Sequence, residues 1–285
     1  MKEKLNNGIY VGERALYNSH DLIITNAVFE DGESPLKESS DIDLVSSTFR
    51  WKYPLWYCKN ITLKNCCLEE TARSGIWYTN GISFLDSRID APKTFRRAKN
   101  IKLINTSMDN ALETLWGSEN IVIKNMNARG DYFAMNSKNI DIENFILNGN
   151  YAFDGSENIV IRNATLYSKD SFWNCKNVTV YDSTIRGEYL AWNSSNITFI
   201  NCTIESNQGL CYMDNVKLVN CVVENTDLAF ELCSNINATI VSHIDSIKNP
   251  ISGIIKVKSV GEIILDEKMI DPLNTKILVG EHNEI

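Results

Sequence analysis

The chain has 285 residues, of which 44% are hydrophobic and 22% are charged, and its formal net charge is −8. This balance is that of a soluble globular protein with enough residues to bury a sizeable core. Fourteen Gly and five Pro are too few for a linker-rich or disordered chain, and the acidic excess argues against nucleic acid or an anionic membrane surface as a partner.

The first 20 residues, MKEKLNNGIYVGERALYNSH, lack the continuous apolar stretch of a signal peptide. No later run reaches the roughly 18 apolar residues of a membrane span. We therefore expect a cytoplasmic protein without a membrane partner, in which the eight Cys are reduced thiols rather than a disulfide framework. Residues 1–20 are expected to form the N-terminal end of the fold.

Residues 21–240 contain one repeated block, which reads Asn, Ile or Val, any residue, an apolar residue, any residue, Asn or Asp. Clear copies are NITLKN (60–65), NIVIKN (120–125) and NIVIRN (158–163). Twelve copies begin at residues 21, 41, 60, 81, 100, 120, 139, 158, 177, 196, 215 and 235, at spacings of 19 to 21 residues. A nearly fixed period of this length indicates a solenoid.

Three apolar stretches recur when the blocks are aligned on their first residue, which we number 0. Positions +1 and +3, such as Ile121 and Ile123, alternate with polar residues, which is typical of a strand with one buried face. Two further apolar columns, at position +8 and five residues before each block, predict two more short strands per turn. Each strand would stack on its equivalent in the next coil, about 4.8 Å away.

This pattern predicts an all-β fold, a single-stranded right-handed parallel β-helix of about twelve turns of 19–21 residues. We expect one domain over residues 1–285, with regular coils at 21–240 and with irregular final coils and a tail at 241–285. A leucine-rich repeat is the main alternative, because its period is also about 20 residues. It requires a helical segment where this sequence carries two further apolar columns, so the β-helix is favoured.

The most frequent polar residue also follows the repeat. Of the 34 Asn, 17 fall at positions 0 and +5, at either end of the first strand. Asn tolerates the left-handed backbone of a corner, and stacked Asn amides can hydrogen-bond from coil to coil. We interpret both columns as structural.

Six of the eight Cys share two columns that otherwise hold mostly small residues, so we interpret them as inward small hydrophobes. Together with only three His, they show no metal-ligand spacing. We therefore expect no metal and no other cofactor.

One outward column differs from an ordinary surface. Five of the six Trp lie four residues before a block, and Tyr, Arg and carboxylate side chains recur three, seven and eight residues before it. We call these columns the aromatic stripe. Trp and Tyr present rigid apolar faces with polar tips, which suit sugar rings, and contiguous exposed aromatic surface indicates an interaction site. The candidate ligand-binding residues are Trp56, Trp77, Arg96, Arg97, Trp116, Tyr132, Tyr151, Lys169, Trp173, Tyr189, Trp192 and Tyr212.

The stripe also carries carboxylates at spacings that suit glycoside hydrolysis. That reaction uses two carboxyl groups, about 5–5.5 Å apart for retention and about 6.5–9.5 Å apart for inversion, and one or two coils separate equivalent residues by about 4.8 or 9.6 Å. The preferred centre is Asp154 with Asp170, beside Lys169, Trp173 and the open space left by Gly155. Arg96 and Arg97 form a second centre, which suggests an anionic group such as a uronate or a phosphate. The candidate catalytic residues are Asp154, Asp170, Glu113, Asp131 and Glu188.

Several segments together resemble an uncharacterised bacterial domain-of-unknown-function family in the pectin-lyase-like β-helix superfamily. They include LKESSDI (36–42), WKYPLWYCKNI (51–61), APKTFRR (91–97), GDYFAMNS (130–137) and FDGS (153–156). The resemblance implies the β-helix fold. Superfamily relatives include pectate lyases and polygalacturonases, which act on acidic polysaccharides. The family itself brings no established reaction, so no catalytic residue is carried over, and the stripe lacks the His that polygalacturonase-like enzymes use.

Two hypotheses follow. The first is a protein that binds or processes a carbohydrate along the stripe, similar to a glycoside hydrolase or a polysaccharide lyase. The second is a non-enzymatic scaffold whose stripe docks a protein partner or a second copy, which leaves a homo-oligomer open. The stripe could instead be covered by a loop or by residues 241–285. The sequence leaves open the ligand, catalysis, the oligomeric state and the exposure of the Trp column.

Overall fold

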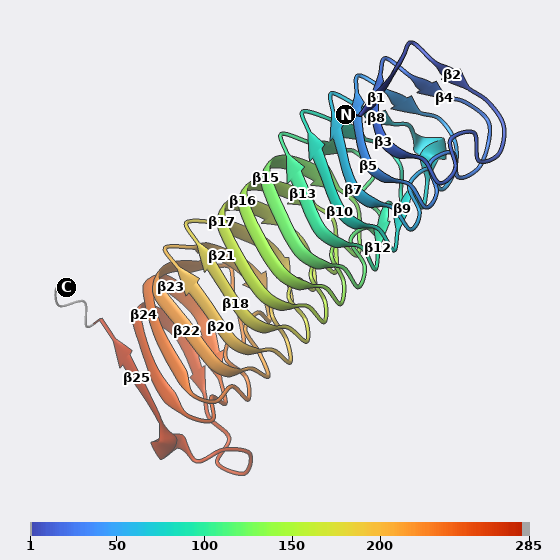
Figure 1. Ribbon diagram of the computed structural model, residues 1–285. Coiled ribbons are helices and arrows are strands. Elements are labelled where there is room, and N and C mark those ends of the chain that lie inside the picture. The colour runs from blue at the N-terminus through green and yellow to red at the C-terminus, as the bar shows by residue number, and fades with distance from the viewer. Residues whose placement is uncertain (1, 281–285) are drawn as a thin grey trace. The chain divides into compact units, whose positions relative to one another are not determined.

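The computed structural model describes residues 2–280, so the outermost residues of the expected domain, 1 and 281–285, lie outside the described residues. Contacts within the chain divide it into two compact units, unit 1 (Met1–Asn148) and unit 2 (Gly149–Ile285). Each unit consists of stacked parallel coils (Figure 1), and buried apolar side chains fill its interior. No helix within residues 2–280 is long and apolar enough to cross a membrane.

In unit 1, the first strand of every coil pairs in parallel with its equivalents, so that Ile121 lies between Ile101 and Ile140. These strands are β1 (Glu3–Asn6), β3 (His20–Thr25), β5 (Ser40–Val45), β7 (Lys59–Lys64), β10 (Asn80–Leu85), β13 (Lys99–Ile104), β15 (Glu119–Arg129) and β16 (Lys138–Asn148). The second side consists of β2 (Ile9–Tyr10), β4 (Val28–Phe29), β6 (Thr48–Phe49), β8 (Cys67–Leu68), β11 (Arg88–Ile89) and β14 (Ser107–Met108) and of the second halves of β15 and β16. A short 3₁₀ helix, η1 (Glu70–Ala72), follows β8.

Unit 2 repeats the arrangement, with Ile197 between Val178 and Val216. Its first strands are β17 (Glu157–Tyr167), β18 (Lys176–Tyr181), β20 (Ser195–Ile200), β22 (Asp214–Glu224), β23 (Ile236–Lys248), β24 (Gly253–Ile264) and β25 (Thr275–Val279). The separate second-side strands are β19 (Thr184–Glu188) and β21 (Thr203–Asn207), and the 3₁₀ helix η2 (Pro272–Asn274) precedes β25.

The expected all-β parallel β-helix is therefore confirmed. Residues 2–280 contain about fifteen turns, eight in unit 1 and seven in unit 2, against the twelve counted from the repeat. The difference arises at the ends, because β1 pairs with β3 before the first recognisable block. After the last block, β24 pairs with β23, and β25 pairs with β24.

The apolar column five residues before each block predicts a strand on the third side of every coil, but most coils do not form one. Among residues 2–280, only β9 (Ile76–Trp77) and β12 (Phe95–Arg96) pair there as strands, and most other coils make turns. The inward residue is buried as expected, but in seven coils it has φ of 57° to 65°. These residues are Leu115, Ala134, Phe153, Phe172, Ala191, Leu210 and Phe230. A left-handed conformation costs a non-glycine residue about 1–2 kcal/mol. Backbone hydrogen bonds to neighbouring coils offset this cost here; the Ala134 N–H, for example, donates to the Thr114 carbonyl at 2.9 Å.

The Asn columns form the expected corners. Asn120 and Asn125, at positions 0 and +5, have φ of 59° and 53°. Their side chains form amide ladders, in which each Nδ2 donates to the Oδ1 of the previous coil, as Asn120 does to Asn100 at 2.9 Å. Asp41 and Asp86 begin two of these runs as pure acceptors. The amide ladders thus hold consecutive coils in register at both ends of the first strand.

Inward polar columns lie inside these corners. The Cys175 thiol donates to the Phe153 carbonyl at 2.9 Å, and one coil later the Ser194 hydroxyl donates to the Phe172 carbonyl at 2.6 Å. Thiol and hydroxyl are thus interchangeable at this position. All eight Cys are free, and every one except Cys67 is buried. Burial raises the pKa of the Cys175 thiol to about 12, which makes it an inert packing group.

Candidate functional site

In unit 1 the aromatic stripe is a stack along the coil axis. Trp56 and Trp77 lie face to face, with ring centroids 5.0 Å apart and planes 8° from parallel. The Arg96 guanidinium continues the stack between Trp77 and Trp116, 4.8 Å and 4.6 Å from their ring centroids. In the adjacent column, Tyr57 and Tyr78 are also stacked, with centroids 4.9 Å apart.

This stacking determines what the stripe can offer to a ligand. The Trp side chains are half-buried, and the Trp56, Trp77 and Trp116 rings have neighbours of the same stack against their faces. Most indole N–H groups are also satisfied inside the fold, since Trp77 donates to the Lys93 carbonyl at 3.0 Å. The column therefore packs laterally on itself and gives little open ring face for a sugar. Among residues 241–285, which the sequence offered as a cover for the stripe, the strand β25 pairs with β24.

A hollow of about 330 Å³ interrupts the stripe beside Arg96. It is lined by Arg96, Arg97, Trp116, Gly117, Met135 and Asn136. Gly117 takes the place where the preceding coils carry Arg97 and Tyr78, so a side chain is missing from the column. A Cβ built on Gly117 would meet only the Arg97 Cγ, at 3.6 Å. The φ of Gly117 is 57°, an angle that Asn136 tolerates in the next coil with φ 54°.

The two guanidinium groups of the hollow differ in their surroundings. Arg96 is fixed by its two Trp neighbours and by Glu113, whose Oε2 lies 3.4 Å from the Arg96 Nη2 and 3.1 Å from the Lys93 Nζ. Arg97 is exposed and forms no ion pair with any residue in the described range 2–280. Glu113 thus pairs with two cations, Lys93 and Arg96, and the exposed Arg97 adds a further positive charge, so the hollow favours an anion.

Two buried donors in this region have no acceptor among residues 2–280. They are the Nε of Arg96 and the indole Nε1 of Trp116. A buried donor without a partner costs about 1–3 kcal/mol. Both residues line the hollow, and both unsatisfied groups are N–H donors. Both N–H groups are enclosed by protein, so a ligand in the hollow would reach them only through a shift of the Arg96 or Trp116 side chain, whereas the exposed Arg97 guanidinium is open to a ligand that supplies acceptor oxygens.

The stripe in unit 2 has a second aromatic stack. Trp173 and Trp192 are parallel, with centroids 5.7 Å apart, and Tyr212 packs edge-on against Trp192 at 5.0 Å. Their indole N–H groups donate to the carbonyls of Tyr189 and Gln208, at 2.6 Å and 2.7 Å. The Lys169 ammonium lies 5.1 Å from the centroid of the Tyr189 ring.

The preferred carboxylate centre lies in unit 2 as well. Lys169 forms an ion pair with Glu188 at 3.1 Å, and Asp154 accepts a hydrogen bond from Asn174 at 2.9 Å. Asp170 is 3% exposed. Burial raises the pKa of Asp170, the nearby Lys169 lowers it, and the charges of Glu188 and Asp154 raise it further. Asp170 is thus the stripe carboxyl whose environment most favours the protonated form.

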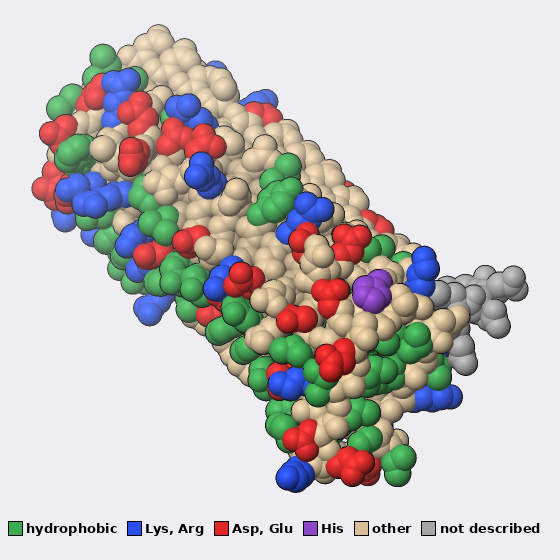
Figure 2. All heavy atoms as spheres, turned by 180° about the vertical axis from the view of Figure 1, so that it is seen from behind, with side chains coloured by type: hydrophobic (Ala, Val, Ile, Leu, Met, Phe, Trp, Pro, Cys, Tyr) green, Lys and Arg blue, Asp and Glu red, His purple; other side chains and the backbone are tan. Residues whose placement is uncertain are grey.

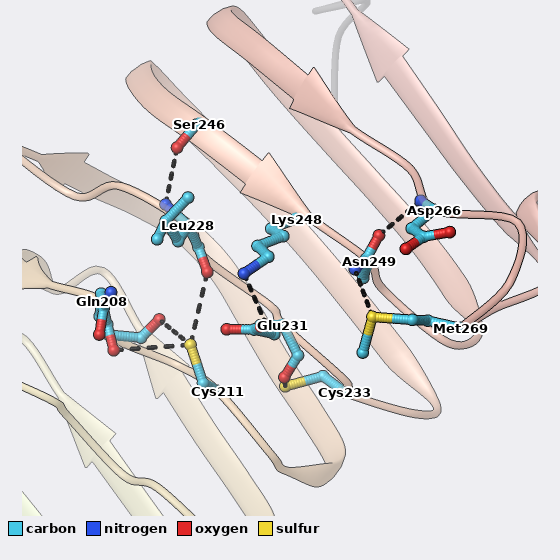
Figure 3. A network of polar contacts seen from close by, with 11 residues as sticks. Gln208, Cys211, Leu228, Glu231, Cys233, Ser246, Lys248, Asn249, Asp266 and Met269 are labelled. Atoms are coloured by element: carbon cyan, nitrogen blue, oxygen red, sulfur yellow. Dashed lines mark hydrogen bonds and ion pairs between the residues drawn. The ribbon is translucent and has the colours of Figure 1, made fainter.

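Beyond Trp192 the Trp column of unit 2 becomes polar and closed. Cys211 takes the next position and is buried, and Glu231 follows one coil later. Figure 3 shows the Lys248 ammonium turned towards the Glu231 carboxylate, at 2.9 Å. The Glu231 side chain is 14% exposed. The Lys248 ammonium thus neutralises the charge of the Glu231 carboxylate in the C-terminal part of the Trp column.

The remaining expected residues lie on the turns of the third side. Asp131 and Tyr132 are half-buried in unit 1, where the Tyr132 ring packs edge-on against Trp116 at 6.4 Å. Tyr151 is half-buried in unit 2. The sequence prediction did not include Gly117, Met135 and Asn136 among the site residues. The absence of a side chain at Gly117, within a column of large ones, was the signal that could have located the hollow.

Comparisons with known proteins identify a family. A family model described as "Protein of unknown function (DUF3737)" matches residues 3–278. No curated protein matches. Among solved structures, PfbA, a surface adhesin of Streptococcus pneumoniae, is 10% identical, with a TM-score of 0.42 over 97% of this chain and 82% of its own. The catalytic domain of a GH87 alpha-1,3-glucanase in complex with nigerose is 15% identical, with a TM-score of 0.36 over 97% and 63%. The A-module of the Azotobacter vinelandii mannuronan C-5 epimerase AlgE4 is 10% identical, with a TM-score of 0.31 over 96% and 87%. At these values the three structures carry no conclusion about the function of this chain.

Proposed function

The chain belongs to the DUF3737 family of proteins of unknown function, and we propose that it binds an acidic carbohydrate. The sugar carboxylate would occupy the hollow between Arg96, Arg97 and Trp116. The observation that carries the proposal is the exposed guanidinium of Arg97, which forms no ion pair among residues 2–280, beside Arg96 and the space left by Gly117.

A carboxylate satisfies this donor set best. It accepts hydrogen bonds at two oxygens, and its pairing with a guanidinium is charge-assisted and often bidentate. The lining also includes Asn136, whose amide can both donate to and accept from a sugar hydroxyl. The volume of about 330 Å³ suits one sugar residue rather than a long chain.

Two variants test the proposal without changing the corner geometry. Asn occurs at the same left-handed position in other coils, so Arg97→Asn and Gly117→Asn preserve the backbone preference while removing the charge or filling the space. Calorimetric titration with a galacturonate tetramer should show weakening of about 10- to 100-fold for Arg97→Asn, since a hydrogen bond to a charged group contributes about 1.5–3 kcal/mol. Gly117→Asn should abolish binding.

Gly155→Asn is the matched control, because Gly155 lies at the equivalent position in unit 2 with φ 70°. It should bind the tetramer as the wild type does. Loss of binding in Gly155→Asn but not in Gly117→Asn would refute the assignment to the Arg96 hollow and favour the Asp154 region. Binding that survives both Arg97→Asn and Gly117→Asn would refute the proposal as well.

A second candidate function is cleavage of a glycosidic bond by the carboxyl groups of unit 2. A nearly buried carboxyl with a raised pKa is what a general acid requires, and Asp170 has this character beside Asp154. Release of reducing ends from polygalacturonate, lost in Asp170→Asn and retained in the distant Asp245→Asn, would support it. Absence of release by the wild type would count against it.

A further inference from the structure

A larger hollow, of about 780 Å³, lies in unit 1 away from the aromatic stripe. One of its walls is the position +5 amide ladder, represented by Asn65, Asp86, Asn105 and Asn125. The other wall lies two residues later, on the outward face of the short second-side strands. We call this hollow the corner groove. Its lining runs from Ser46 to Asn127 over five consecutive coils, so it is long along the coil axis.

The ladder wall has amide N–H groups and oxygen lone pairs that the ladder itself does not use. Asn105 donates one N–H to Asp86 at 2.9 Å and accepts one from Asn125 at 2.9 Å. An Asn amide has two N–H donors and two acceptor lone pairs, so each such rung keeps one donor and one acceptor after the ladder is formed. These amides are exposed. The Asn rungs of the groove, Asn65, Asn105 and Asn125, thus offer both a donor and an acceptor, whereas Asp86 offers acceptors only.

The opposite wall offers hydroxyl and amide groups with little free charge. Thr48, Ser107 and Asn127 carry neutral polar side chains. The one cation in the lining, Arg88, is paired with Asp90 at 3.2 Å and contacts the Cys67 thiol at 3.5 Å. Asp86 adds a carboxylate. The groove thus lacks the excess of positive charge that an anionic chain requires, and it exposes little apolar surface.

We propose that the corner groove binds an oligosaccharide of neutral sugars that lies along the coil axis. A hydroxyl both donates and accepts, which matches a wall that presents donors and acceptors on its three Asn rungs. A chain of repeated hydroxyl-bearing units can make the same contact on several coils. This site is separate from the Arg96 hollow and does not depend on the function proposed for it.

The test uses neutral hexasaccharides of glucose, mannose and galactose, titrated calorimetrically into the full chain. At least one should bind, and Ser107→Trp should weaken it at least tenfold because the indole fills the groove. Asn127→Trp, on the same wall, should do the same if the first variant folds poorly. Thr184→Trp is the matched control, because Thr184 has the same position and half-burial in a coil of unit 2; it should leave the affinity unchanged.

A salt series and one further variant separate the alternatives. Raising the salt concentration tenfold should change the affinity less than threefold, because a neutral ligand makes no ion pair; a larger change would overturn the assignment to neutral sugars. Gly117→Asn should leave hexasaccharide binding intact even though it closes the Arg96 hollow. Binding by none of the hexasaccharides, or equal loss in Ser107→Trp and Thr184→Trp, would overturn the proposal.

Discussion

Substitution of Asn120 separates the two roles that we assign to the corner asparagines. Its Nδ2 donates to Asn100 at 2.9 Å, and its Oδ1 accepts from Asn139 at 2.9 Å. Its backbone is left-handed, with φ 59°. Alanine removes both hydrogen bonds and strains the backbone. Glycine removes both bonds without strain, and aspartate keeps the acceptor for Asn139 but cannot donate to Asn100.

These differences set the order of stability. A net hydrogen bond contributes about 0.5–1.5 kcal/mol, and solvent-exposed ladder bonds lie at the low end, so the two bonds together contribute about 1–2 kcal/mol. Left-handed alanine adds about 1–2 kcal/mol, whereas glycine adds about 0.5–1 kcal/mol through the entropy of the unfolded chain. We expect wild type to be most stable, followed by Asn120→Asp, Asn120→Gly and Asn120→Ala, with a total span of about 2–4 kcal/mol.

Urea unfolding followed by circular dichroism measures this order. Stacked coils can unfold in parts, so the slopes of the transitions must agree before midpoints are compared. A matched series at Asn196 in unit 2, which donates to Asn177 at 3.0 Å and accepts from Asn215 at 2.8 Å, should give the same ranking. The reasoning is refuted if alanine is at least as stable as glycine, or if all variants lie within about 0.3 kcal/mol of wild type.

Three other predictions concern the stripe. Burial raises the pKa of Asp170, so this carboxyl contributes fully to stability below its unfolded pKa of about 3.9, and the contribution decreases as the pH rises through the higher native pKa. Asp170→Asn should therefore unfold at a higher temperature than wild type at pH 7 but not near pH 3. Unfolding temperatures of the two proteins that differ by the same amount at every pH would contradict this. Trp192→Phe loses an indole hydrogen bond and should cost about 0.5–1.5 kcal/mol in urea unfolding without affecting galacturonate binding. Trp116→Phe removes a buried donor that has no acceptor among residues 2–280, so it should destabilise the protein less than Trp192→Phe, and it should weaken galacturonate binding because Trp116 lines the hollow and stacks on Arg96. The opposite pattern would argue against a ligand in this hollow. The scaffold hypothesis for a homo-oligomer requires the exposed tyrosines Tyr57 and Tyr78 to dock a second copy of the chain. Wild type should then sediment as a dimer, and the double variant Tyr57→Ser, Tyr78→Ser as a monomer. A monomeric wild type would contradict a homo-oligomer formed through this surface.

The fold could be predicted from sequence because its period appears directly in the side chains. Ile121 and Ile123 repeat coil after coil, and the Asn columns mark corners whose left-handed backbone few other residues tolerate. The third side could not be predicted in the same way. An apolar residue such as Phe153 indicates burial but not its backbone angles, and φ of 65° is maintained by the bonds between coils rather than by the preference of Phe.

The site was only partly predictable for a related reason. Columns place Trp56, Trp77 and Trp116 on one line, but whether ring faces or edges meet solvent depends on side-chain torsions that the sequence does not specify. Arg96 and Arg97 were identified from their positions in the stripe and from their charge. The hollow beside them depends on the missing side chain at Gly117. The corner groove lies where the position +5 ladder meets the second-side strands, and no single residue encodes that meeting.

The most direct test of the central claim compares two ligands on the wild-type chain. A galacturonate tetramer and its fully methyl-esterified form differ only in the charge of the carboxyl groups, so binding through Arg96 and Arg97 must distinguish them. We predict that calorimetric titration detects the acidic tetramer and shows the ester at least tenfold weaker, with the difference decreasing as salt is raised. Equal affinity for the two tetramers, or tighter binding of the ester, would contradict a carboxylate site in the Arg96 hollow.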